Sequence, residues 1–158
     1  MRVILERSNL LKSLNHVHRV VERRNTIPIL SNVLLSAEGA SLEMKAADLD
    51  LEVTEATPAK VERGGATTVP AHLLYDIVRK LADGAEVMLK TDEDGNAMTV
   101  TSGRSSFRLQ CLPQSDFPEL SAGSFSHIFR LDSVDLKGLI EKTQFAICLL
   151  YTSDAADE

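Results

Sequence analysis

The sequence has no tryptophan and few aromatic residues of any kind, since Phe, Tyr and Trp together make up 4% of its 158 residues. Proteins that bind single-stranded nucleic acid by stacking its bases need several aromatic platforms, so this composition disfavours that class. Only two cysteines occur, Cys111 and Cys148, and they lack the CxxC spacing of zinc or redox motifs. The composition therefore predicts neither a zinc site nor a disulfide framework.

Long apolar runs are also absent from the sequence. No stretch approaches the roughly 20 apolar residues that span a membrane. The first residues, MRVILERSNLL, lack the apolar region and cleavage site of a signal peptide. We therefore expect a cytoplasmic protein. With 44% hydrophobic content, its 158 residues suffice for one sizeable core and the beginning of another.

Patterns that would indicate catalysis or metal binding are incomplete. His16 and His18 lie two residues apart, which on a helix points them about 160° away from each other. The segment DEDGNA, from Asp92, begins like a calcium loop, but its glycine comes one position early and no bidentate Glu follows, so we expect a hairpin turn. Asp48 and Asp50 lack the further acids of a two-metal nuclease, and no Ser or Cys has an identifiable base. The sequence predicts no catalytic residue, no cofactor and no metal site.

A local excess of positive charge stands out instead. The chain has a formal net charge of −6, yet the segment Asn9–Asn25 carries four Lys or Arg residues against one Glu. Apolar residues recur in it at helical spacing and predict a helix with a buried stripe formed by Leu10, Leu14, Val17 and Val21. The opposite stripe carries Lys12, His16, Arg19 and Arg23, followed by Arg24.

A second amphipathic helix is predicted over AHLLYDIVRKL (71–81), after a turn at GGATTVP, with Pro70 well placed for its first turn. Its apolar side is formed by Leu74, Ile77 and Leu81. Its outer side carries His72 and Arg79, with Lys80 on the flank. Two helices with basic outer faces are typical of a surface that lies along a polyanion, where Lys and Arg neutralise phosphates without reading sequence. The alternatives are a basic face that only meets solvent, and a non-enzymatic scaffold that binds an acidic partner.

Alternating apolar residues predict strands around these helices. The segments are RVILE (2–6), NVLLSAE (32–38), SLEMKAA (41–47), LEVTEATPA (51–59), AEVMLKT (85–91), MTVTSG (98–103) and SSFRLQCL (105–112). The order of strand, helix and three strands, run twice, predicts an α+β fold in which antiparallel sheets carry two helices. In addition, ILERSNLLKSL and FRLDSVDLKGL share four identical residues at a separation of 125, each as a strand that runs into a helix. We therefore expect a second copy of the domain to begin near Ser126.

Several segments, taken together and in order, resemble the bacterial β sliding clamp of DNA polymerase III. They are LERSNLLKSL, RRNTIPILSNVLL, AADLDLEV, GATTVPA, SGRSSFRL, LPQSDFPEL and LIEKTQFAI. The resemblance implies an N-terminal clamp domain over 1–122 and the beginning of a central domain over 126–147. In that family three such domains form each chain, and two chains close head to tail into a ring around duplex DNA. The implied function is that of a non-catalytic processivity factor that tethers the replicative polymerase, of which this chain would be an incomplete part.

The same resemblance assigns roles to individual residues. The basic stripe would face DNA phosphates, and Arg24 and His72 stand where the family has DNA-contacting arginines, although a neutral histidine holds phosphate less well. The strand containing SGRSSFRL would meet the third domain of the other subunit and would be left unpaired here, with Phe107 or Leu109 as an exposed apolar contact. The candidate interface residues are Arg104, Ser105, Phe107 and Leu109. The implied partners are duplex DNA, a second subunit, the polymerase and the clamp loader, with no membrane, and the family's partner-docking pocket would be absent from this chain.

The last eleven residues, CLLYTSDAADE (148–158), depart from the clamp pattern. They resemble the conceptual translation of a transposase sequencing adapter. We therefore expect this segment to be a non-native tail that takes no part in the fold.

Overall fold

The computed structural model describes residues 1–21, 26–48, 51–118, 127 and 129–146. The chain divides into two units, Met1–Leu120 and Ser121–Glu158. No described helix is long and apolar enough to cross a membrane.

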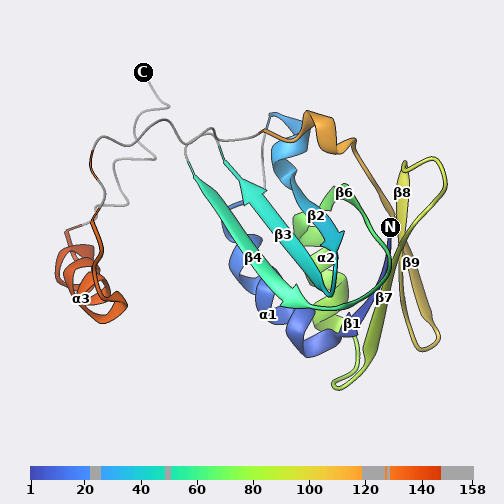
Figure 1. Cartoon of the computed structure of the whole chain (residues 1–158), viewed down its shortest axis with the longest axis horizontal. Coiled ribbons are helices and arrows are strands. Elements are labelled where there is room, and N and C mark those ends of the chain that lie inside the picture. The colour runs from blue at the N-terminus through green and yellow to red at the C-terminus, as the bar shows by residue number, and fades with distance from the viewer. Residues whose placement is uncertain (22–25, 49–50, 119–126, 128, 147–158) are drawn as a thin grey trace. The chain divides into compact units, whose positions relative to one another are not determined.

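Two antiparallel sheets form most of the first unit (Figure 1). The four-stranded sheet has the order β4-β3-β2-β6, with β2 at Asn32–Glu38, β3 at Ser41–Ala47, β4 at Glu52–Pro58 and β6 at Gly65–Pro70. The five-stranded sheet has the order β5-β1-β7-β8-β9, with β1 at Arg2–Glu6, β5 at Lys60–Arg63, β7 at Glu86–Thr91, β8 at Ala97–Ser102 and β9 at Ser105–Gln110. A single bridge between Thr68 of β6 and Leu112, just beyond β9, connects the two sheets.

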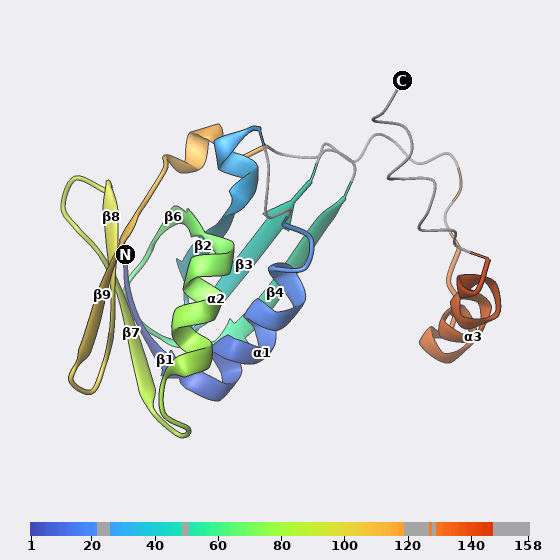
Figure 2. The same ribbon diagram turned by 180° about the vertical axis from the view of Figure 1, so that it is seen from behind.

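Two helices, α1 (Arg7–Val17) and α2 (Ala71–Lys80), lie side by side against the sheets (Figure 2). Helix α1 contacts β3 and β4, and α2 contacts β6. One hydrophobic core joins both helices to both sheets. The predicted apolar stripe of the first helix is buried, as Leu10, Leu14, Val17 and Val21 are all at most 4% exposed. These features bear out the α+β prediction.

The ends of several elements differ from the prediction. Helix α1 ends at Val17, not near Asn25, although Val21 is still buried beyond its end. On α2 the buried residues are Ala71, Leu74 and Val78, whereas the predicted Ile77 and Leu81 are only partly buried. For α1, the prediction assumed one uninterrupted helix as far as Asn25. For α2, it placed the buried side of the helix at the wrong angle around the helix axis.

In the segment predicted as a turn, GGATTVP, all residues after Gly64 form strand β6, and the preceding strand β5 was not predicted. Glycine and small residues gave this segment a turn-like composition, but β6 pairs with β2 in register from Asn32↔Pro70 to Ala37↔Gly65. Tertiary pairing therefore overrides the local preference. Because β6 precedes α2, the order of strand, helix and three strands does occur twice.

The predicted hairpin at DEDGNA is confirmed, since residues 92–96 connect the paired strands β7 and β8. Gly95 adopts the left-handed conformation with φ +72°. The two carboxylate oxygens of Asp92 accept hydrogen bonds from the Ala97 amide and from Arg108, at 3.2 and 3.0 Å. Asp92, the first acid of the calcium-like pattern, thus accepts hydrogen bonds within the sheet that contains the hairpin. Among the described residues no group of three or more His, Cys, Asp or Glu side chains could hold a metal ion.

The second unit contains one helix among its described residues, α3 (Ser133–Gln144). This helix occupies the place of the helix predicted in the repeat, but residues 129–132 before it do not form the strand expected there. Its apolar side chains are all exposed: Val134, Leu136, Leu139 and Ile140. An amphipathic helix normally buries such a stripe against another element. Residues 148–158, the adapter-like segment, lie outside the described residues.

Candidate nucleic-acid interface

Three of the predicted DNA-binding cations are exposed and make no ion pair or hydrogen bond with another described residue: Lys12, Arg19 and Lys80. Lys12 lies on α1, Arg19 follows the end of α1, and Lys80 is the last residue of α2. These three side chains are available to bind an anion. Arg23 and Arg24 lie outside the described residues.

His16 is exposed on α1, as predicted, but an acidic residue accompanies it. Its Nδ1 lies 2.7 Å from Glu55 Oε1 on β4. The side chains of His16 and Glu55 are 49% and 33% exposed, so the pair contributes little to stability. Because the carboxylate offsets any charge on the imidazole, His16 adds less positive potential than its place in the stripe suggests.

Arg79 is exposed on α2 and is also partnered. Its Nη2 lies 3.2 Å from Asp76 Oδ1, and its Cζ lies 5.6 Å from the centroid of the Tyr75 ring. The pairing with Asp76 follows the three-residue spacing of neighbours on a helix surface. Both contacts hold the guanidinium close to α2, and Asp76 offsets part of its charge.

His72 does not lie free on the outer face of α2, where the sequence placed it. Its imidazole is partly buried, and Nε2 lies 2.8 Å from the backbone carbonyl oxygen of Val21. A carbonyl oxygen can only accept a hydrogen bond, so Nε2 carries the hydrogen and donates it. The helical wheel of α2 could not reveal this contact, because the acceptor belongs to the chain beyond α1.

The ring of His18 contacts those of His72 and Tyr75, and we call these three residues the histidine cluster. The His18 ring stacks on Tyr75 with centroids 3.9 Å apart and an angle of 7° between the planes, and it meets His72 edge-on at 5.6 Å. Nδ1 of His18 lies 2.8 Å from the carbonyl oxygen of Leu14. Ring pairs of this kind contribute about 0.5–1.5 kcal/mol beyond the area that they bury. The cluster thus fastens the chain after α1 to the first turns of α2.

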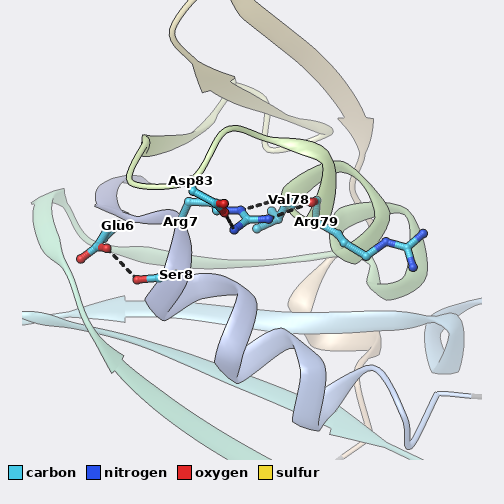
Figure 3. A network of polar contacts seen from close by, with 6 residues as sticks. All are labelled: Glu6, Arg7, Ser8, Val78, Arg79 and Asp83. Carbon is cyan, nitrogen blue, oxygen red and sulfur yellow. Dashed lines mark hydrogen bonds and ion pairs between the residues drawn. The ribbon is translucent and has the colours of Figure 1, made fainter.

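At the other end of the helix pair, Arg7 at the start of α1 binds the C-terminal end of α2 (Figure 3). Its Nε and Nη2 donate hydrogen bonds to the carbonyl oxygens of Val78 and Arg79, at 3.2 and 2.8 Å, and its Nη1 pairs with Asp83. The last carbonyls of a helix lack partners within the helix, so Arg7 caps the C-terminal end of α2. The Arg7 side chain is 14% exposed, whereas that of Asp83 is 93% exposed.

These contacts show that α1 and α2 run antiparallel and are held at both ends. Arg7 begins α1 and binds the last turn of α2, while His72, near the start of α2, binds the chain beyond the end of α1. Arg7 could not be found from the sequence, because its bond to Val78 spans 71 positions of the chain and leaves no local pattern. The two helices, joined at both ends, carry Lys12 and Lys80, and Arg19 lies just after the end of α1.

The pKa of His18 lies below its ordinary value of 6.5. Burial is the largest cause, because it disfavours the charged imidazolium. The nearby His72 and Arg19 also lower this pKa, while the hydrogen bond to the Leu14 carbonyl raises it. His18 is therefore neutral near pH 7.

We expect the histidine cluster to make folding acid-sensitive. The folded-state pKa of His18 is lowered, so its contribution to stability is complete above about pH 6.5 and is lost as the pH falls through the folded-state pKa. His18→Phe keeps an aromatic ring but removes the titration, and should flatten the plot of Tm against pH between about 7.5 and 5. His16→Gln, a histidine outside the cluster, is the control. An unchanged slope in His18→Phe, or equal flattening in His16→Gln, would contradict this assignment.

The second predicted site lies at strand β9, and three of its four predicted residues are exposed. Among the described strands β9 pairs with β8 alone and ends the five-stranded sheet. Arg104, Ser105 and Phe107 are exposed, Phe107 to 39%. Leu109 is only 1% exposed, so the expectation of an exposed contact at Leu109 is wrong. Its strand partner Met98 is buried as well, and Leu109 packs with it into the core.

An α+β domain of two antiparallel sheets and a pair of antiparallel helices is the fold of DNA clamp domains, and solved sliding clamps share it. The chain belongs to the family described as DNA polymerase III beta subunit, N-terminal domain, which matches residues 1–121. This finding confirms the predicted family.

Relatives with assigned names agree with this membership. The Beta sliding clamp of Caulobacter vibrioides is 50% identical over 147 residues, and that of Escherichia coli K12 is 40% identical over 148 residues. Each match covers 93% of this chain and 40% of the relative. A solved sliding clamp (DNA polymerase III subunit beta) from Bartonella birtlesii is 57% identical with a TM-score of 0.88, over 94% of this chain and 40% of that one. The chain thus spans about 40% of the length of the relatives that it matches.

Proposed function

We propose that this chain is the N-terminal part of a bacterial replication processivity factor, a ring-forming clamp that encircles duplex DNA and tethers the replicative polymerase. In this role the chain is a non-catalytic accessory subunit. The observation that carries the proposal is a pair of helices joined at both ends, in a domain of the clamp family, with three exposed cations that have no partner among the described residues: Lys12, Arg19 and Lys80.

Such a surface suits a protein that must move along DNA. Lysine and arginine side chains bind phosphate oxygens and release condensed counterions, and these contacts carry no information about base sequence. Each contact contributes about 0.9 to the slope of log K against log salt concentration, so a few exposed cations give weak, salt-sensitive binding. Weak contacts with a uniform backbone allow sliding, while closure of a ring would prevent escape.

The remaining residues support ring assembly. The β9 edge offers backbone donors and acceptors to a strand of another subunit, which is a common mode of association between sheets. In this proposal Arg104, Ser105 and Phe107 contact the second subunit, while Leu109 supports the strand from the core. Residues 126–147 begin the central domain, which would cover the exposed apolar side chains of α3. The polymerase and the clamp loader would dock on domains that this chain does not contain.

We further propose that residues 148–158 are not part of the natural protein. The Caulobacter relative aligns with 93% of this chain, so a short part of the chain lies outside that match. Sequencing the genomic DNA across codon 147 tests this. Clamp sequence after Ile147 supports the proposal, and an open reading frame that continues into CLLYTS refutes it.

The proposed ring predicts a difference between circular and linear DNA. The complete protein, loaded onto a nicked circular duplex, should stay bound through a wash at moderate salt and should leave once the circle is linearised. The 158-residue chain should be lost from both forms, because it lacks the domains that close the ring. Gel filtration of the protein–DNA mixture measures retention. Equal loss of the complete protein from circular and linear DNA would refute topological binding, and retention of the short chain on circles alone would show that it closes a ring by itself.

A further inference from the structure

We infer that His72 is a positioning residue: it donates a hydrogen bond that fixes the chain after α1 against α2, and it does not bind phosphate. The consequence for DNA binding rests on the proposed function, whereas the hydrogen bond itself does not. His72 would thus support a neighbouring cation instead of acting as one.

The imidazole ring of His72 has few hydrogen-bond donors. A neutral imidazole has one N–H donor, and in His72 this donor is Nε2, which is engaged by the carbonyl oxygen of Val21 at 2.8 Å. The other nitrogen, Nδ1, is then an acceptor. Phosphate oxygens are acceptors too, so a neutral His72 in this geometry has nothing to offer a phosphate.

The hydrogen bond from His72 to Val21 holds the chain segment after α1 in place. Val21 is 4% exposed although it lies beyond the end of α1. His18, three residues earlier, is stacked on Tyr75 of α2. Arg19 lies between these two anchors and is itself exposed and without a described partner. The backbone that carries Arg19 is therefore attached to α2 on both sides.

Bracing of this kind affects affinity through preorganisation. A cation on a fixed backbone loses less conformational freedom when it binds a phosphate, so binding costs less entropy. Removal of the His72 donor should weaken DNA binding while the number of phosphate contacts in the complex stays the same. A phosphate ligand would behave differently, because its removal would also reduce the salt dependence.

The test compares His72→Gln, which retains an N–H donor at a similar reach, with His72→Ala, which does not. Binding of a fluorescein-labelled duplex to the 158-residue chain is followed by anisotropy at several low salt concentrations. We expect His72→Gln to bind within about twofold of the parent, and His72→Ala about 3- to 10-fold more weakly, as for the loss of one hydrogen bond. Both should retain the parent salt slope, whereas the control Lys80→Gln should lower that slope by about 0.9.

Two outcomes would overturn the inference. If both His72 variants lower the salt slope by about 0.9, His72 is a phosphate ligand. If His72→Ala binds like the parent, the bond to Val21 does not serve DNA binding.

An NMR measurement separates failure of this inference from failure of the proposed function. Imidazole ¹⁵N shifts of the unmodified chain near pH 8 should show the Nε2–H tautomer for His72 and the Nδ1–H tautomer for His18. An Nδ1–H tautomer at His72 overturns the inference whatever the DNA data show. If the parent chain binds no duplex while both tautomers are as expected, the proposed function fails and the hydrogen bond stands.

Discussion

Replacement of both Lys12 and Arg19 by glutamate should weaken binding of duplex DNA at least about tenfold at low salt, and should lower the slope of log K against log salt by about 1.8. Both side chains are exposed, and no described residue forms an ion pair with either of them. Each lost phosphate contact removes about 0.9 from the slope, and the new carboxylates add repulsion. Anisotropy titrations with two duplexes of unrelated sequence measure both quantities, and the two duplexes should respond alike.

The matched control reverses two exposed cations of strand β5, Lys60 and Arg63. This double variant changes the net charge by the same amount but leaves the helix pair untouched. We expect it to keep the parent salt slope. Equal losses in the two double variants would mean that net charge, and not the helix surface, governs binding.

Arg7→Met should lower the free energy of unfolding by about 1.5–3 kcal/mol, the range for hydrogen bonds that involve a charged group. Methionine keeps much of the aliphatic stem but cannot donate to the carbonyl oxygens of Val78 and Arg79. The end of α2 then loses its cap, and the helix pair is held at one end only. Urea denaturation, with equal m-values for variant and parent, measures this loss.

Asp83→Asn distinguishes the cap from the ion pair. Asp83 is 93% exposed, so its pairing with Arg7 is screened by solvent, and the substitution should stay within about 0.5 kcal/mol of the parent. If Asp83→Asn costs as much as Arg7→Met, the ion pair carries the effect and the capping role of Arg7 is wrong.

Most of the fold could be predicted because its local patterns agree with its tertiary structure. Leu10, Leu14 and Val17 follow the helical period and are buried, and the alternation in β2 and β3 matches their pairing. Strand β6 could not be found in this way, since its glycine and small residues favour a turn and only pairing with β2 makes it a strand. The end of α1 was also missed, because Val21 continues the apolar spacing after the helix has stopped.

The site was predictable only in part. Spacing alone placed Lys12, Arg19 and Lys80 on the surface, where the structure has them. It could not show that Glu55 accompanies His16, or that His72 is bound to Val21, which is 51 positions away in the chain. Helical periodicity assigns a residue to a face of its own helix, but charge partners from other elements decide whether that residue is free to bind a ligand.

The central claim, that the paired helices form the DNA-binding face, is tested most directly by mapping amide chemical shifts during titration of the ¹⁵N-labelled chain with a short duplex at low salt. We expect shifts along the exposed side of α1, at residues 18–20 and along α2, with the strands of the five-stranded sheet unaffected. Shifts confined to those strands, with none on α1 or α2, would contradict it.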